Sequence, residues 1–147
     1  MKDSLTHLVN VNDKPKFLYR LMVELAGNAR MSLEGDLSQC RFADEILVSR
    51  DEVGKLKRGT LAPRLDFIVL RLTPETVDSI FKQVMAAGLK RGIVHVQIER
   101  NNVLELGAYD NFHSECVATG RGVGLTLLDE LKRTNVLSDF RLATPVT

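Results

Sequence analysis

Two neighbouring segments of the chain alternate between apolar and polar residues, and this alternation restricts the fold more than any other feature. In residues 93–99, Val94, Val96 and Ile98 share one face, and residues 103–109 alternate in the same way. A period of two residues is typical of strands that bury one face. Since only a short polar break separates the two segments, the sequence predicts an antiparallel β-hairpin.

The apolar pattern also predicts the register of this hairpin. A two-residue turn at Asn101 and Asn102 would place the carboxylate of Glu105 opposite Ile98, on the apolar face. A three-residue turn that includes Arg100 avoids this, because it pairs apolar residues with one another. The longer turn sets Val96 opposite Leu106 and His95 opposite Gly107. We therefore expect the longer turn, with Asn102 in the left-handed conformation.

Further strands and helices on either side of the hairpin complete the fold prediction. Residues 65–72 are apolar on both faces, which is typical of an interior strand. A helix is expected to follow from Thr73 to Gly88, and a second helix and a last strand over 121–134 and 137–142. The order strand, helix, strand, strand, helix, strand over 65–142 predicts a ferredoxin-like core with a mostly antiparallel sheet and both helices on one face.

The first sixty residues are expected to add a helix, a strand and a short helix to this core. Asp13 is a suitable N-cap for a helix over residues 14–26, and a strand follows at about 30–34. A capping-box pattern that begins at Ser49 predicts a short helix ending near Arg58. This α-β-α addition would cover the second face of the sheet, so that residues 1–147 form a single α+β domain.

The helices and strands predict one common core. Apolar residues of the helix over 73–88 recur at the i, i+3, i+4 spacing of a single buried face. The side chains expected to be buried together are Phe67, Ile68, Leu70, Ile80, Phe81, Val84, Val94, Val96, Leu106, Leu127 and Leu131.

Composition and charge favour a soluble cytoplasmic protein of bacterial character. The 147 residues include 20 Lys and Arg against 19 Asp and Glu, a net charge of +1, which argues against nucleic-acid binding. No apolar run approaches the roughly 18 residues of a membrane span, and the N-terminus lacks the apolar segment of a signal peptide. Cys40 and Cys116 lie far apart, so we expect two free thiols, as in a reducing cytoplasm.

Residues 109–116 are the chemically richest stretch of the chain. They include a phenol, an imidazole, a thiol and two carboxylates, supplied by Tyr109, His113, Cys116, Asp110 and Glu115. The expected hairpin register brings His95 to the same face. Almost every group needed for acid–base or nucleophilic catalysis is therefore present. The structural alternative is an ordinary polar loop, in which Asp110 begins a turn and Phe112 fills the core.

Two narrower hypotheses concern the same stretch. His113 and Cys116 have a workable spacing for two zinc ligands, but the chain offers no second pair of Cys or His, so we predict neither a metal site nor a cofactor. Activation of Cys116 by His113, by His95 or by the following helix would make it a nucleophile. A cysteine that merely fills the core is the alternative.

A glycine-rich segment and a basic run are weaker candidates. Gly120, Arg121 and Gly122 precede a predicted helix, which is the geometry of a phosphate site. The segment lacks the Gly-Lys-Ser/Thr ending of a P-loop, so close backbone packing is the alternative. Lys55 and Lys57 fall in the last turn of the predicted short helix, where cations are stabilised without any functional role.

Two classes of function therefore stay open. We favour a non-enzymatic binding or regulatory module that contacts another protein or, through a sheet edge, a second copy of itself. The alternative is a hydrolase or lyase acting on a small substrate, with His113, Glu115, Cys116 and His95 at its centre. An enzyme requires these side chains to converge on one pocket, whereas a binding module leaves them apart or bonded to backbone groups.

Overall fold

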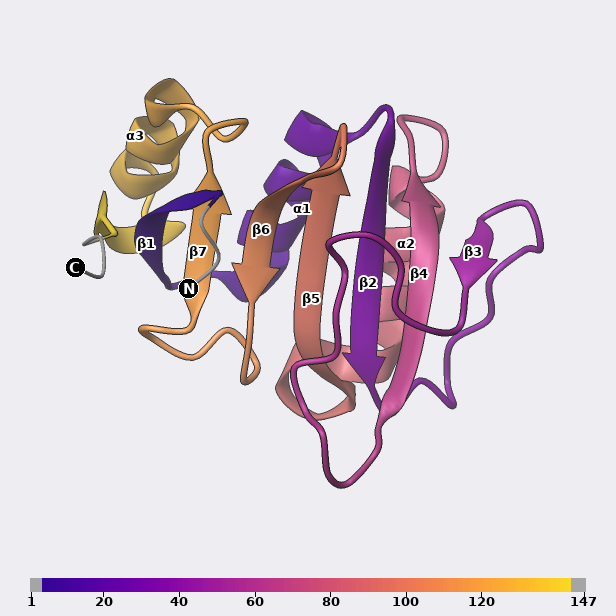
Figure 1. Ribbon diagram of the computed structural model, residues 1–147. Coiled ribbons are helices and arrows are strands. Elements are labelled where there is room, and N and C mark those ends of the chain that lie inside the picture. Colours follow the sequence, from indigo (N-terminus) through magenta and orange to yellow (C-terminus); the bar gives the residue numbers. More distant parts are fainter. Residues whose placement is uncertain (1–3, 144–147) are drawn as a thin grey trace.

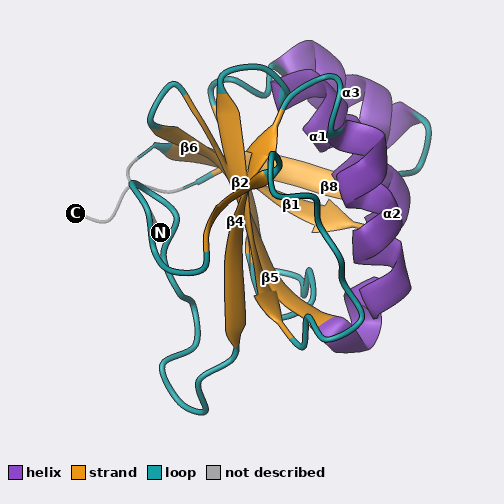
Figure 2. Ribbon diagram, turned by 90° about the vertical axis from the view of Figure 1, so that its right-hand side faces the viewer, coloured by secondary structure: helices purple, strands orange, loops and turns teal. Residues whose placement is uncertain are grey.

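Eight strands, hydrogen-bonded in the order β3-β4-β2-β5-β6-β7-β1-β8, form one antiparallel sheet in the computed structural model, which describes residues 4–143. In chain order the elements are β1 (Leu5–Val11), α1 (Lys14–Leu25), β2 (Ala29–Gly35), β3 (Leu47–Ser49), β4 (Asp66–Leu72), α2 (Val77–Ala87), a π-helical turn (Gly88–Gly92), β5 (Ile93–Arg100), β6 (Val103–Ala108), β7 (Val117–Gly120), α3 (Leu125–Arg133) and β8 (Leu137–Leu142). The three helices lie on one side of the sheet (Figures 1 and 2). The α+β class and the antiparallel sheet are therefore as predicted.

The strand order corrects the ferredoxin-like arrangement predicted for residues 65–142. Strand β2 lies between β4 and β5, and strands β7 and β1 lie between β6 and β8. The N-terminal segment therefore supplies interior strands rather than an α-β-α addition outside the sheet. Periodicity identifies which segments are strands, but it does not say which strands become neighbours, because the pairing joins residues that are distant in the sequence.

Strands β1 and β7 were not predicted. In β1 the polar side chains of Thr6, His7 and Asn10 interrupt the alternation, and only Leu5 and Val9 are buried. Strand β7 has four residues and follows directly on a polar loop. Helix α3 also begins later than expected, because residues 121–123 form a turn.

The short helix predicted to end near Arg58 does not form. The hydroxyl of Ser49 accepts a hydrogen bond from the Asp51 backbone N–H at 3.0 Å, which closes a local turn instead of capping a helix. Residues 50–65, which we call the strap, cross the helix-free face of the sheet in front of β5 and β2 (Figure 1). Leu56 in the strap is fully buried. The strap therefore covers the face that the sequence assigned to a helix.

The predicted hairpin register is wrong by two residues, one because the turn is shorter than predicted and one because β6 contains a β-bulge. Asn101 and Asn102 form a two-residue turn with φ angles of 52° and 64°, so the predicted left-handed Asn102 is correct but the longer turn is not. The register shifts between Ile98 and Glu99, and Glu105 is the additional residue in β6. The observed pairs are Val96 with Ala108, Gln97 with Gly107 and Ile98 with Leu106. The bulge keeps Ile98 opposite an apolar residue without a longer turn.

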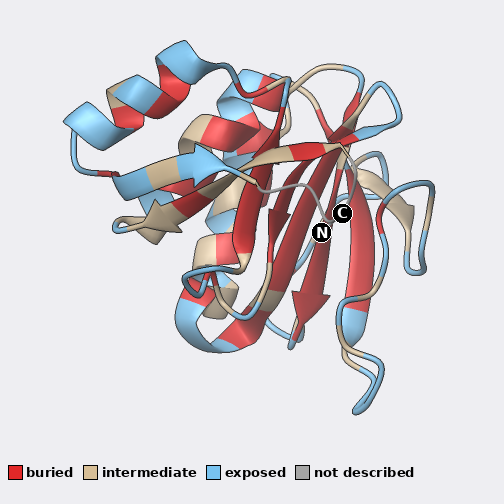
Figure 3. Cartoon of the chain, turned by 60° about the vertical axis from the view of Figure 1, so that its left-hand side comes forward, coloured by how far each residue is buried: buried red, intermediate tan, exposed pale blue. Residues whose placement is uncertain are grey.

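The main core lies between the sheet and the helices, and the middle strands are almost entirely buried (Figure 3). It contains most of the predicted core residues, with Phe81 packed at its edge. Phe67 instead joins a second apolar cluster with Leu56 on the helix-free face, and Val94 is only half-buried.

Cys40 and Cys116 are both free thiols. None of the described helices is long and apolar enough to cross a membrane.

Candidate functional site

Backbone N–H groups of the strap donate hydrogen bonds to polar side chains on β2 and β5. These bonds run from Lys55 to Glu99 (2.9 Å), from Lys57 to Gln97 (2.9 Å) and from Gly59 to Glu34 (2.7 Å). The three accepting side chains are at most 2% exposed. Glu99 also forms an ion pair with Arg30 at 2.7 Å. These buried polar groups are therefore satisfied by the strap and the sheet, which gives them a structural role.

Tyr109 lies next to this polar row, with its ring over Gly107. A Cβ atom at Gly107 would lie 2.9 Å from the Tyr109 hydroxyl oxygen, so a glycine is needed for the ring to approach the sheet. The Gln97 side-chain oxygen accepts from Lys57 N–H and from the Ser32 hydroxyl, which fixes the orientation of its amide. Its Nε2 then donates to the Tyr109 oxygen at 2.8 Å. The hydroxyl proton of Tyr109 is left to donate elsewhere.

Burial raises the pKa of Tyr109, and the nearby Glu34 carboxylate raises it further, although the hydrogen bond from Gln97 opposes both. The phenol is therefore protonated throughout the physiological range. Because its oxygen already accepts from Gln97, it acts toward any neighbouring ligand as a hydrogen-bond donor.

His95 is buried beneath Tyr109, and both of its ring nitrogens have partners. Nδ1 accepts a hydrogen bond from the Asp110 backbone N–H at 3.1 Å, so it carries no proton. The proton is therefore on Nε2, which donates to the Thr60 hydroxyl at 2.7 Å. The ring also packs against Tyr109 at a centroid distance of 5.5 Å. His95 joins the strap to the sheet and has no free nitrogen for acid–base catalysis.

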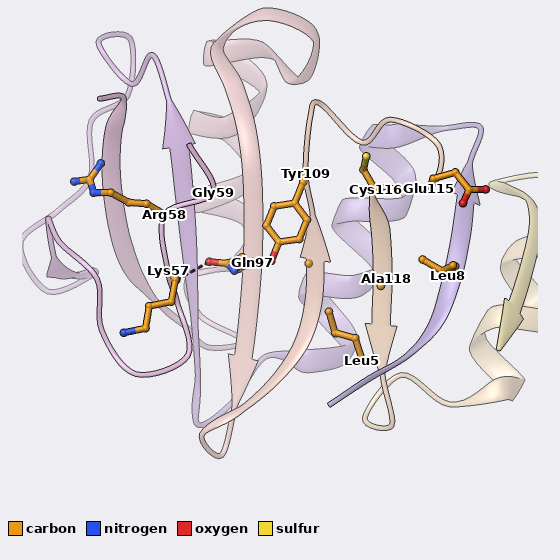
Figure 4. Close-up of a pocket in the computed structure, with 11 residues that line it drawn as sticks. Leu5, Leu8, Lys57, Arg58, Gly59, Gln97, Tyr109, Glu115, Cys116 and Ala118 are labelled. Carbon is orange, nitrogen blue, oxygen red and sulfur yellow. Dashed lines mark hydrogen bonds between the residues drawn. The ribbon is translucent and has the colours of Figure 1, made fainter. Parts of the chain in front are cut away.

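A groove of about 610 Å³ opens on the helix-free face between the strap and strand β1 (Figure 4). Its polar side is formed by the strap, by Gln97 and by Tyr109, and Leu5, Leu8 and Ala118 form an apolar wall on the other side. Lys57 is exposed at the strap rim, while Arg58 points away from the groove in Figure 4. The Arg58 guanidinium instead donates to the Leu65 carbonyl and stacks over Phe67.

Glu115 and Cys116 lie at the opposite rim of the groove. The Glu115 carboxylate is bound by Arg141, whose Nη2 lies 3.1 Å from Oε2. The thiol of Cys116 is 3.8 Å from the Asp110 carboxylate. Burial raises the pKa of Cys116, and the negative charges of Asp110 and Glu115 raise it further. Among the described residues no imidazole is hydrogen-bonded to the sulfur, so neither His95 nor His113 is placed to activate Cys116.

Replacement of Asp110 by asparagine should make Cys116 more reactive. Removing the carboxylate removes a charge that disfavours the thiolate, so the pKa of Cys116 falls and more thiolate is present at pH 8. Each unit of decrease gives about ten times more thiolate at a fixed pH below the pKa. The rate of alkylation by iodoacetamide, followed at Cys116 by mass spectrometry, should increase. Alkylation of the buried Cys40 serves as the internal control, and an unchanged Cys116 rate would contradict this account.

The remaining polar residues of the loop do not reach the groove. His113 is exposed, and its Nδ1 lies 2.8 Å from the carbonyl oxygen of Ser114. The loop is fixed by Phe112, which is buried against Phe17, and by Asn111, which donates to the Ile93 carbonyl at 2.7 Å. The structure thus brings together Tyr109, Glu115 and Cys116 but leaves His113 outside and His95 beneath.

The glycine-rich segment encloses a side chain of the protein itself. Glu105, the bulge residue, is 7% exposed, and its carboxylate lies against Gly120 and Gly122, where a Cβ atom on either glycine would collide with it. Its Oε1 atom has no hydrogen-bond partner among the described residues. A carboxylate in this position repels an anion, so Gly120, Arg121 and Gly122 provide close packing rather than a phosphate site. Glu105 therefore points toward these glycines and not toward the groove.

The sequence contained no signal for the residues of the apolar wall or for the rim position of Lys57. Leu5, Leu8 and Ala118 belong to the two strands that were not predicted, and Lys57 was assigned to a helix. Within residues 4–143, no group of three or more His, Cys, Asp or Glu side chains is arranged to hold a metal ion.

Comparisons with known protein families, with curated proteins and with solved structures find no match for this chain.

Proposed function

We propose that the protein is a cytoplasmic, non-enzymatic binding module whose groove holds an extended acidic segment of a partner protein. The observation that carries the proposal is the pairing of an apolar wall with two donors on the facing side, the Tyr109 hydroxyl and the Lys57 ammonium. The free thiols of Cys40 and Cys116 support a reducing compartment.

The apolar wall suits the side chains of an extended peptide. Leu5 and Ala118 are buried in the second apolar cluster, and Leu8 packs against it, so together they offer a rigid surface. An apolar side chain of a partner would gain roughly 25 cal/mol for each Å² it buries there. The peptide backbone would lie along the middle of the groove, within reach of the Tyr109 hydroxyl.

The charge of the two rims selects an acidic partner. Lys57 has no ion pair among the described residues, whereas Glu115 on the other rim is already neutralised by Arg141. The residues that line the groove therefore carry a net positive charge. A carboxylate on the partner would bind Lys57 and would accept the Tyr109 hydroxyl proton in a charge-assisted hydrogen bond.

The alternative, a hydrolase or lyase, has less support. Of its four central residues, His113 is outside the groove, His95 has both nitrogens bonded, Glu115 is held by Arg141, and Cys116 has a raised pKa. Side chains that are separated, or bonded to structural groups, are the arrangement expected of a binding module rather than of a catalytic centre.

A labelled peptide in which leucine alternates with glutamate tests the proposal. We expect it to bind the native protein in fluorescence anisotropy. Lys57→Glu should weaken this binding about tenfold or more, which corresponds to about 1.4 kcal/mol or more. Tyr109→Phe should weaken it by a smaller factor, because the ring is retained and only the hydroxyl is lost. The same peptide with lysine in place of glutamate should not bind.

Lys55→Glu is the matched control. Lys55 is also an exposed lysine of the strap, and its N–H is bonded to the sheet like that of Lys57, but its side chain does not line the groove. Equal losses from Lys55→Glu and Lys57→Glu would show a general charge effect and would overturn the groove assignment, as would an absence of binding to the native protein.

A further inference from the structure

Strand β8 is an open edge of the sheet. Among the described residues it is paired on one side only, with β1, and four of its six residues are exposed. The other edge strand, β3, has only three residues. An edge strand presents unpaired N–H and C=O groups that can accept another strand. Strand β8 is therefore the longer edge at which the sheet can be extended.

The hydrogen bonds to β1 determine which backbone groups of β8 point outward. The N–H of Ala143 donates to the carbonyl of Thr6 at 2.8 Å, so it points toward β1. Alternate residues of an antiparallel strand point the same way, so Arg141 and Asp139 also bond to β1. The backbone groups of Phe140 and Leu142 consequently point away from the sheet. A bulge at Ser138 ends the regular part of this edge.

The side chains of β8 are complementary to a second copy of the same strand. If two β8 strands pair antiparallel around Phe140, the outward N–H and C=O of Phe140 bond to those of Phe140 of the second copy. The same register places Asp139 opposite Arg141 of the second copy, and Arg141 opposite its Asp139. These are non-hydrogen-bonded pairs, in which opposing side chains are closest. Both side chains are more than half exposed.

We propose that the protein forms a homodimer by two-fold antiparallel pairing of its β8 strands, so that the two sheets become continuous. The symmetric arrangement of Asp139 and Arg141 about Phe140 favours a second copy over an unrelated strand. Leu142, which is 71% exposed, would lie beside Phe140 of the second copy and lose part of its contact with water. Strand β8 does not line the groove, and the two sites meet only at Arg141, which pairs with Glu115 on the groove rim.

The present ion pairs of these residues do not prevent the pairing. Asp139 lies 3.3 Å from Lys132, and Arg141 lies 3.1 Å from Glu115. Exposed ion pairs of this kind contribute little to stability and exchange readily for others. Since one short strand and two ion pairs hold the dimer, its formation should depend on protein concentration and salt.

Charge exchange across the predicted register tests the dimer. Asp139→Arg places Arg opposite Arg141, and Arg141→Asp places Asp opposite Asp139, so each single variant should sediment as a monomer at concentrations where the native protein is dimeric. An equimolar mixture of the two variants restores both opposite-charge pairs and should form a heterodimer. The double variant Asp139→Arg/Arg141→Asp should form a homodimer again. Circular dichroism would verify that each variant is folded.

A native protein that sediments as a monomer at all accessible concentrations overturns the proposal. So does a mixture of the two single variants that stays monomeric while the native protein dimerises, because the dimer would then use another surface. Titration of the acidic peptide into monomeric Asp139→Arg, which keeps the ion pair between Arg141 and Glu115, separates this result from the proposed function, since groove binding should persist without the dimer.

Discussion

Replacement of Ile80 by alanine should lower the free energy of unfolding by about 2–5 kcal/mol, the usual cost of truncating a buried isoleucine. Ile80 lies on the face of α2 that packs against the sheet, and its side chain is fully buried in the main core. The substitution removes apolar contacts and leaves a cavity that the surrounding strands cannot fill. Urea unfolding followed by circular dichroism measures the loss.

Val23→Ala provides the control for Ile80→Ala. Val23 is also an apolar helix residue, but it is on the outer side of α1 and is 51% exposed. Its replacement should change stability by less than about 0.5 kcal/mol. A similarly small change for Ile80→Ala would mean that α2 does not cover the sheet as described.

Glu99→Ala should cost about 2–4 kcal/mol of stability. The change leaves the Arg30 guanidinium and the Lys55 backbone N–H without their carboxylate partner. Removing one partner of a fully buried ion pair costs about 3–5 kcal/mol, and partial exposure of Arg30 reduces this figure. Urea unfolding gives the magnitude, and hydrogen exchange at the Lys55 amide shows whether this part of the strap has been released.

Glu99→Gln separates the two contacts of Glu99. Glutamine retains an oxygen that accepts the Lys55 N–H but lacks the charge that pairs with Arg30. We expect a smaller loss of stability than for Glu99→Ala, with the Lys55 amide still protected. Glu24→Ala, at an exposed position of α1, should leave both measurements almost unchanged. Fast exchange of Lys55 in the native protein would be evidence against a bound strap.

Local patterns in the sequence were sufficient for the segments whose own residues specify their structure. Asp13 caps α1 and accepts a hydrogen bond from the Lys16 N–H, as its position before Pro15 predicts. Gly88 ends α2 with a φ angle of 90°, and the limits of β8 are those predicted. In these cases a cap, a breaker or a regular alternation acts within a few residues, so the physical cause is contained in the local sequence.

The candidate site could be predicted only in part. Tyr109, Glu115 and Cys116 were identified because their chemistry is visible in the sequence, and they lie on the groove. The role of His95 depends on bonds to Thr60 and Asp110, which are 35 and 15 residues away. The apolar wall depends on the pairing of β1 with β7, which joins segments more than 100 residues apart in the sequence. Such contacts leave no periodic pattern in either partner.

The sequence by itself therefore determined the α+β class, the positions of the more regular helices and strands, and the free state of the two cysteines. Only the tertiary structure decided the strand order, the bulge at Glu105, the path of the strap and the groove beside it. The reason is that the pleat and the helical turn repeat within a few residues. Strand neighbours and buried polar bonds instead depend on which distant segments together bury the most apolar surface and satisfy the most hydrogen bonds.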